Sequence, residues 1–124
     1  MQNLILYAVS YLLGSVPSGL ILAKIFGHVD IKKEGSKSIG ATNVLRVLKQ
    51  TNPKLAKKLA ILTVVCDVLK GVLPLIVASS LGASQSTLWT MAVLSVAGHC
   101  FSIFLGFQGG KGVATGAGVI AFFL

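Results

Sequence analysis

Between residues 35 and 46 the chain reads GSKSIGATNVLR, a mixture of glycines, hydroxyls, an amide and an arginine. Glycines such as Gly35 and Gly40 allow tight turns that bring backbone N–H groups close to a ligand. A helix expected to begin near Ala41 would point unpaired N–H groups and the positive end of its dipole at the same place. Hydroxyl, amide and guanidinium donors suited to phosphate oxygens would come from Ser36, Thr42, Asn43 and Arg46. The segment predicts a phosphate-binding loop, although a capped surface helix after an ordinary glycine turn accounts for the same residues.

A second glycine loop, GGKG, opens directly into an apolar stretch. Three sets of backbone donors and one positive point charge would come from Gly109, Gly110, Gly112 and Lys111. The nucleotide-binding P-loop is excluded, because Leu105 and Gly112 stand where that motif requires a glycine and a hydroxyl residue. Taken alone, the loop is better explained as a flexible turn whose lysine sets the membrane topology, and only the combination of the two loops favours a binding site.

Three ionisable residues, Asp67, Lys70 and His99, lie inside stretches that are otherwise apolar. Asp67 and Lys70 are three positions apart and would share one face of a helix. A lone charge in the middle of a bilayer costs at least about 2.5–3.5 kcal/mol, so we expect these side chains to pair with one another. They predict a polar network about 12 Å deep that fixes helix packing and supports the site from below. A proton relay is the alternative.

The composition indicates an integral membrane protein. The 124 residues are 54% hydrophobic and only 11% charged, whereas a soluble domain averages about a quarter charged, and the mean hydropathy is +0.86. Most of the positive charge lies in residues 24–58, which is the positive-inside pattern rather than a nucleic-acid-binding face. Cys66 and Cys100 lie in apolar runs without a metal-ligand spacing, so neither a disulfide nor a metal site is expected.

The hydropathy pattern predicts an all-α bundle that forms a single membrane domain over residues 1–124. Its membrane spans would be residues 4–23, 59–81, 88–107 and 112–124. The last of these would reach about 20 Å of the roughly 30 Å required, so we expect it to be incomplete and the chain to be the N-terminal part of a longer protein. With the N-terminus outside and loop 24–58 in the cytoplasm, both glycine loops would face the cytoplasm.

Local signals add detail to this outline. Residues 41–51 are expected to form a short amphipathic helix that Thr42 or Asn43 caps and that Pro53 ends. The sequence GSVPSG at residues 14–19 should kink the first span.

Four segments of the chain can be compared with a known family: GSVPSG at 14–19, GSKSIGATNVLR at 35–46, DVLKG at 67–71 and GHCFSIFLGFQGGKGVAT at 98–115. Together they resemble the PlsY family, the acyl-phosphate-dependent glycerol-3-phosphate acyltransferases of bacterial membranes. The resemblance covers nearly the whole chain in the family's order and spacing. It implies a seven-span inner-membrane protein that transfers an acyl group from acyl phosphate to glycerol 3-phosphate and forms lysophosphatidate. The substrate-binding and catalytic positions that it implies are Ser36, Thr42, Asn43, Arg46 and Lys111.

The chain departs from the family's pattern in three places. Lys37-Ser38 replaces the usual Gly-Asn, and Ser102 and Gln108 stand where proline and lysine are commoner. A third motif, with a histidine and an asparagine, would lie beyond Leu124. We therefore expect these 124 residues alone to be inactive.

The resemblance implies a mechanism without a cofactor or metal. The GATN loop would bind the acyl phosphate, while Arg46, Lys111 and Ser36 would hold glycerol 3-phosphate. Because His99 would be too deep and Ser36 has no paired histidine, the substrate's own phosphate oxygen is expected to take the hydroxyl proton. The alternatives are a small four-helix transporter that uses Asp67 as its intramembrane acid, and an inactive fragment of the acyltransferase.

Overall fold

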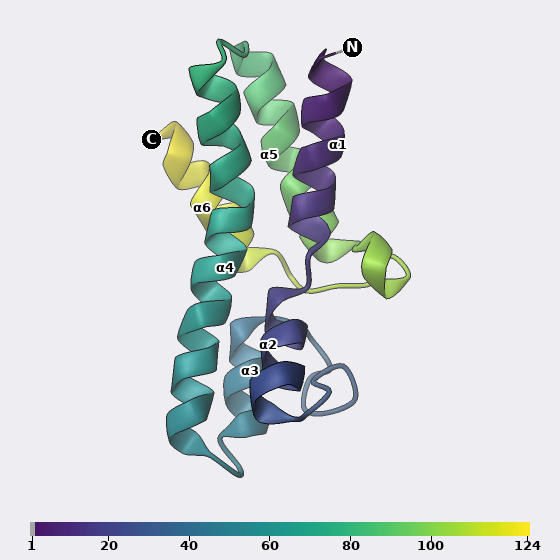
Figure 1. Ribbon diagram of the computed structural model, residues 1–124, viewed down its shortest axis with the longest axis vertical. Helices are drawn as coiled ribbons and strands as arrows, with labels where there is room; N and C mark the ends of the chain where they lie inside the picture. Colours follow the sequence, from purple (N-terminus) through teal and green to yellow (C-terminus); the bar gives the residue numbers. More distant parts are fainter. Residues whose placement is uncertain (1) are drawn as a thin grey trace. The chain divides into compact units, whose positions relative to one another are not determined.

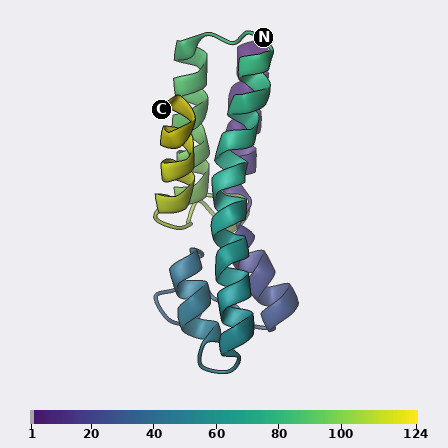
Figure 2. The same ribbon diagram turned by 90° about the vertical axis from the view of Figure 1, so that its left-hand side faces the viewer.

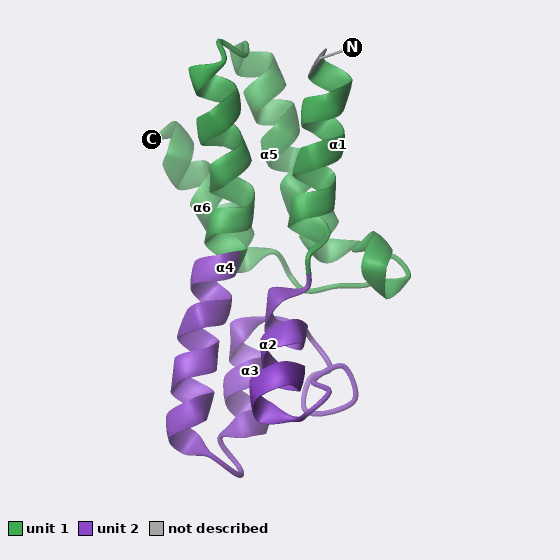
Figure 3. Cartoon of the chain, viewed as in Figure 1, with its two compact units in different colours: residues 1–16, 67–124 green, residues 17–66 purple. Residues whose placement is uncertain are grey.

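The computed structural model describes residues 2–124, which fold into helices without a strand (Figure 1). The α-helices are α1 (Gln2–Ser15), α2 (Ser18–Gly27), α3 (Ala41–Leu48), α4 (Pro53–Ser80), α5 (Gln85–Cys100) and α6 (Val113–Phe123), and a 3₁₀ turn, η1 (Ile103–Leu105), follows α5. The all-α fold is therefore confirmed. The chain divides into two compact units, which Figure 3 colours separately: unit 2 is residues 17–66, and unit 1 combines the residues up to 16 with residues 67–124. The hydropathy pattern that predicts a single domain does not reveal this division.

The first apolar stretch is not one continuous helix. The expected span of residues 4–23 is interrupted between α1 and α2, where Pro17 adopts φ −84° and ψ 75°. Proline lacks a backbone N–H and disfavours helical geometry at the residue before it, so the kink expected at this position is a full break. By length and composition alone, the stretches Asn3–Gly27 and Pro53–Ser80 could each cross a membrane.

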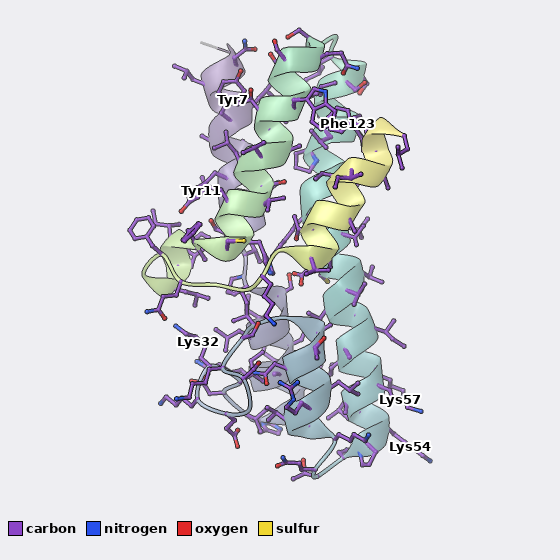
Figure 4. All side chains as sticks on the ribbon, turned by 180° about the vertical axis from the view of Figure 1, so that it is seen from behind. Tyr7, Tyr11, Lys32, Lys54, Lys57 and Phe123 are labelled. Atoms are coloured by element: carbon purple, nitrogen blue, oxygen red, sulfur yellow. The ribbon has the colours of Figure 1, made fainter. Side chains whose placement is uncertain are left out.

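Three other helices differ from the expected bounds, mainly at one end. Helix α3 starts at Ala41 as expected but ends at Leu48 rather than 51. Helix α4 starts at Pro53, within the expected loop, because proline suits the first helical position and Asn52 Oδ1 accepts a hydrogen bond from the Leu55 N–H at 3.2 Å. The side chains of Lys54 and Lys57 point outward from this first part of α4 (Figure 4). Helix α5 ends at Cys100 rather than 107, since the chain turns into a closed loop there.

Unit 1 is built on close contact between α1 and α5, with α6 beside α5 (Figure 2). A Cβ at Gly14 would meet the backbone of Ser95, and one at Gly98 would meet the Tyr11 carbonyl. Small residues at both positions let the two helix backbones approach. The buried apolar core of this unit consists of Leu75, Ala78, Leu88, Met91, Ala92 and Val119.

Unit 2 packs α2 against α3 and holds the loop of residues 28–40. Val44, Val47 and Leu48 form the buried face of α3, and Leu45, which the amphipathic pattern also places on the apolar side, is half-buried. Gly19 in α2 makes room for the backbone of the loop, because a Cβ there would meet the Ile39 carbonyl. The loop is consequently anchored at Ile31 and Ile39, which are both buried.

Candidate active site

Asn43 organises the glycine loop of unit 2. Its side chain is 1% exposed, and its Nδ2 donates to the carbonyl oxygens of Ser38 at 2.8 Å, Ile31 at 2.9 Å and Glu34 at 3.2 Å. Its Oδ1 accepts the Ser36 N–H at 3.0 Å. All polar atoms of the amide are thus used within the unit, so Asn43 shapes the loop from the inside rather than offering a free group to a ligand.

The backbone of this loop turns through two residues with positive φ. Gly35 has φ +58°, and a Cβ on it would meet the Asn43 amide oxygen. Lys37 has φ +64°, in the left-handed region that favours glycine. This gives a physical reason for the glycine that the PlsY family usually carries at the position of Lys37, one of the departures noted above.

The N-terminus of α3 has no side-chain cap. Its cap residue is Gly40, so the expected capping by Thr42 or Asn43 is wrong, because the Asn43 amide is turned back into the loop. Within the described part of the chain, the N–H groups of the first turn, from Ala41 to Asn43, have neither an intrahelical partner nor a side-chain acceptor. An uncapped helix start of this kind is a ready anion-binding site.

Three of the expected site residues of unit 2 are exposed. Thr42 and Arg46 stand four positions apart on one face of α3, and Ser36 lies in the loop before it. Ser36 also uses its hydroxyl as an acceptor for the Ser38 N–H at 3.4 Å. The structure therefore combines free backbone amides, hydroxyls and a guanidinium within one unit, a donor set that suits a phosphate group.

The GGKG loop of unit 1 lies against the end of α5. The Gly110 N–H donates to the His99 carbonyl at 3.1 Å, so that amide is not available to a ligand. Cβ atoms at Gly109 and Gly110 would meet the His99 carbonyl and imidazole respectively. Gly112 has φ +76° and is the cap residue of α6, again without a side-chain cap. As expected, the loop leads directly into a helix, and Lys111 is exposed within it.

Two contacts that the sequence did not predict tie the segment before this loop to α1. Tyr11 Oη donates to the Phe101 carbonyl at 2.6 Å, and Ser102 Oγ donates to the Ser15 carbonyl at 2.6 Å. Ser102 also pairs through its backbone with Gln108, the other residue that departs from the family's pattern in this segment. A proline at 102 could not donate the N–H that bonds the Gln108 carbonyl at 3.0 Å. In the sequence, these contacts were indicated only by the presence of Ser102 at a position where the family more often has proline.

The structure brings Asp67, Lys70 and His99 together in unit 1. Lys70 Nζ lies 3.0 Å from Asp67 Oδ1, 2.8 Å from His99 Nδ1 and 2.9 Å from the Val16 carbonyl oxygen. The three side chains are between 2% and 9% exposed. His99 is the penultimate residue of α5, so it lies at the end of its helix. Its expected depth in the membrane stays a prediction. The role of this network as a support for the site stays a prediction.

Among the residues that the structure describes, no group of three His, Cys, Asp or Glu side chains could hold a metal ion.

Comparison with known proteins identifies one family across this chain. The family model described as Glycerol-3-phosphate acyltransferase matches residues 4–124. A curated glycerol-3-phosphate acyltransferase of Campylobacter concisus (strain 13826) is 97% identical over 124 residues, which are 100% of this chain and 61% of that protein. Proteins of the same name from Campylobacter lari and Aliarcobacter butzleri are 64% and 65% identical, over 100% and 95% of this chain and 61% and 57% of their own lengths. The chain spans about three fifths of the length of these relatives.

Two solved structures have the same fold. They are crystal structures of PlsY (YgiH), described as an integral membrane glycerol 3-phosphate acyltransferase, in its glycerol 3-phosphate form and its lysophosphatidic acid form. Both are 40% identical to this chain and cover 97% of it and 56% of their own length, with TM-scores of 0.80 and 0.79.

Proposed function

The chain belongs to the glycerol-3-phosphate acyltransferase family, and on that premise we propose that it carries part of the site that transfers an acyl group from acyl phosphate to sn-glycerol 3-phosphate. The product would be lysophosphatidate, and the reaction would be the first acylation of bacterial phospholipid synthesis. The observation that carries this proposal is the uncapped start of α3, with Thr42 and Arg46 exposed beside it. Both substrates are phosphates, which this donor set suits.

In this proposal the backbone amides at the start of α3 bind a phosphate group, and Thr42 and Ser36 add neutral donors. Arg46 contributes a guanidinium that can form two parallel bonds to phosphate oxygens. A hydrogen bond to a charged group contributes about 1.5–3 kcal/mol net, so a few of them hold a dianion well. Asn43, which the family resemblance implies as a substrate-binding position, instead acts by keeping the loop in shape.

Lys111 is assigned a similar task in its own loop, where it neutralises phosphate charge as a single ammonium group. The glycines around it serve mainly to let the loop lie against His99 and to start α6. Only part of the backbone-donor role predicted for this loop is therefore retained, because the Gly110 N–H already bonds the His99 carbonyl.

The reaction needs little covalent help from the protein, because acyl phosphate is already activated. The hydroxyl oxygen of glycerol 3-phosphate bonds to the acyl carbon, the bond from that carbon to the phosphate oxygen breaks, and inorganic phosphate leaves. We assign the hydroxyl proton to a phosphate oxygen of the substrate, since within the described residues His99 is buried and Ser36 has no histidine partner. Positioning and charge neutralisation then supply the rate enhancement.

The transporter alternative would use Asp67 as an acid that faces a substrate path. In the structure Asp67 is 2% exposed and forms an ion pair with Lys70, which does not favour that role.

The chain is part of an integral membrane protein, and we propose that its membrane is the bacterial inner membrane, with the N-terminus outside. Loop residues 24–58 and 109–112 would then both face the cytoplasm, following the positive charge. Cysteine substitution of the exposed Lys37 and Lys111, followed by labelling with a membrane-impermeant reagent, tests this topology. Labelling of either position from the outside of intact cells would contradict it.

A direct test is transfer from acyl phosphate to radiolabelled glycerol 3-phosphate in detergent. It compares these 124 residues alone with the same chain completed by the remaining part of the Campylobacter concisus relative. We expect the completed chain to form labelled lysophosphatidate and the 124 residues alone to form none. A completed chain that is folded but forms no product would refute the proposed function.

A further inference from the structure

The ammonium group of Lys70 is the centre of the buried cluster in unit 1. It has three N–H donors and no acceptor. Its Nζ lies within hydrogen-bond distance of His99 Nδ1, at 2.8 Å, and of the Val16 carbonyl oxygen, at 2.9 Å, and it forms an ion pair with Asp67 Oδ1 at 3.0 Å. The aspartate balances its charge, so the pair can be buried without a net charge. Lys70 thereby connects α4 with the ends of α1 and α5.

The contact with Lys70 determines which nitrogen of the His99 ring carries the proton. Because an ammonium group can only donate, Nδ1 of His99 must be the acceptor, and the ring proton of the neutral imidazole then sits on Nε2. The Nε2 edge of the ring is the edge that a Cβ at Gly110 would meet. The ring therefore lies between the Lys70 ammonium and the glycine loop.

Hydrogen bonds on both sides of Lys111 attach the loop to residues of this buried cluster. At its start, the Gly110 N–H bonds the His99 carbonyl at 3.1 Å. Beyond its end, Thr115 Oγ1 in the first turn of α6 donates to the Asp67 carbonyl at 2.8 Å, and Thr115 is fully buried. Lys111 lies between these two attachments, and its own side chain is exposed.

We propose that Lys70 is a positioning residue for the transfer reaction: through His99 it fixes the glycine loop, and through the loop it fixes the backbone from which Lys111 reaches the substrate. The inference rests on the proposed function of Lys111. A proton relay through the same residues is less consistent with the geometry, because Asp67 Oδ1 and His99 Nδ1 are 3.9 Å apart and the ammonium group contacts both.

The test is a double-mutant cycle in the completed chain. Asp67→Asn/Lys70→Met removes both charges together and leaves no uncompensated carboxylate in the core, and it is combined with Lys111→Ala. We expect kcat/KM for glycerol 3-phosphate to fall about tenfold or more when Lys111 is present, mainly through KM. In the Lys111→Ala background the same two substitutions should change it by less than about twofold, because the residue that they position is already gone.

Two results of the cycle would overturn the inference. Wild-type kinetics in Asp67→Asn/Lys70→Met would show that the loop does not need the network. An equal loss with and without Lys111 would show a merely structural defect. Lys57→Met is the matched control, since Lys57 is an exposed lysine of the same helix, and it should leave the kinetics unchanged.

Hydrogen exchange gives a second readout that does not depend on activity. In Asp67→Asn/Lys70→Met we expect faster exchange at the Gly110 amide and in a peptide covering residues 106–112, with unchanged protection in α1 and α5. Faster exchange throughout unit 1 would show that the network stabilises the whole unit rather than the loop, and would overturn the inference. If the native completed chain makes no product, the proposed function fails, while the exchange result still decides whether Lys70 fixes the loop.

Discussion

The two glycine loops, residues 35–40 and 109–112, have similar sequences but are held in place differently. Each leads into a helix whose cap residue is a glycine without a side-chain cap. The first loop is held by Asn43, a side chain from the first turn of the helix that it precedes. The second is held by His99, which belongs to the preceding helix and contacts Lys70 of α4.

Because the two loops have different supports, substitutions at different sites should change their shapes. The first carries its own support, so its shape depends on residues close in sequence, from 31 to 43. The second has only glycines and one lysine, and its shape is imposed by residues between 67 and 99. Substitutions within the motif should therefore dominate at the first loop, whereas substitutions outside the motif should reach the second.

The largest expected effect is the removal of the support inside the first loop. Asn43→Ala would leave three carbonyls and one N–H without their partner, so we expect a loss of about 3 kcal/mol in the free energy of unfolding. Asn52→Ala is the matched control, because that exposed asparagine makes one capping bond, to the Leu55 N–H, and its loss should cost about 1 kcal/mol. Thermal unfolding in detergent measures both. Equal losses would mean that Asn43 does not hold the loop.

At the second loop, a single added methyl group tests the contact with α5. Gly109→Ala places a Cβ against the His99 carbonyl, and we expect about 1–3 kcal/mol of destabilisation because backbone must move. Gly116→Ala in α6 meets open space and should instead stabilise the helix by about 0.5–1 kcal/mol. If both variants unfolded at the same temperature, the described contact between the loop and the His99 carbonyl would be refuted.

The smallest expected effect is the relief of backbone strain in the first loop. Lys37→Gly should stabilise the protein by up to about 1 kcal/mol, since glycine adopts the observed φ of +64° without strain. Lys33→Gly provides the control, because Lys33 is an exposed loop lysine outside the positive-φ positions and glycine there adds only unfolded-state entropy. A loss of stability in Lys37→Gly would contradict the proposed strain. Thermal unfolding again supplies the measurement.

Features set by local sequence were predictable. A helix starting near Ala41 was expected, and the spacing of Val44, Leu45, Val47 and Leu48 predicted its apolar side, on which Leu45 is half-buried and the other three are buried. The junction from the GGKG loop into α6 was likewise predicted. The role of Asn43 was not, because its acceptors at Ile31, Glu34 and Ser38 come together only when the loop has folded.

The end of α5 shows a second limit. Residues 101–107 are almost as apolar as the helix before them, so hydropathy alone continues the span to 107. The helix stops at Cys100 because Ser102 and Gln108 pair through their backbones and Tyr11 bonds the Phe101 carbonyl. Tyr11 is far from Phe101 in the sequence, and the pairing of Ser102 with Gln108 involves only backbone atoms. Hydrophobic periodicity therefore predicts neither contact. At Pro17 the sequence predicted the position of a kink correctly, but not that the helix would be interrupted there.

We propose that the uncapped start of α3 and Arg46 bind a phosphate substrate. The most direct measurement is the KM for glycerol 3-phosphate of Arg46→Ala and Lys49→Ala in the completed chain, since both residues are exposed cations of the same short segment. We expect KM to rise at least about tenfold in Arg46→Ala, because one charge-assisted contact is lost, and to change by less than about twofold in Lys49→Ala. Equal effects of the two substitutions, or wild-type kinetics in Arg46→Ala, would contradict it.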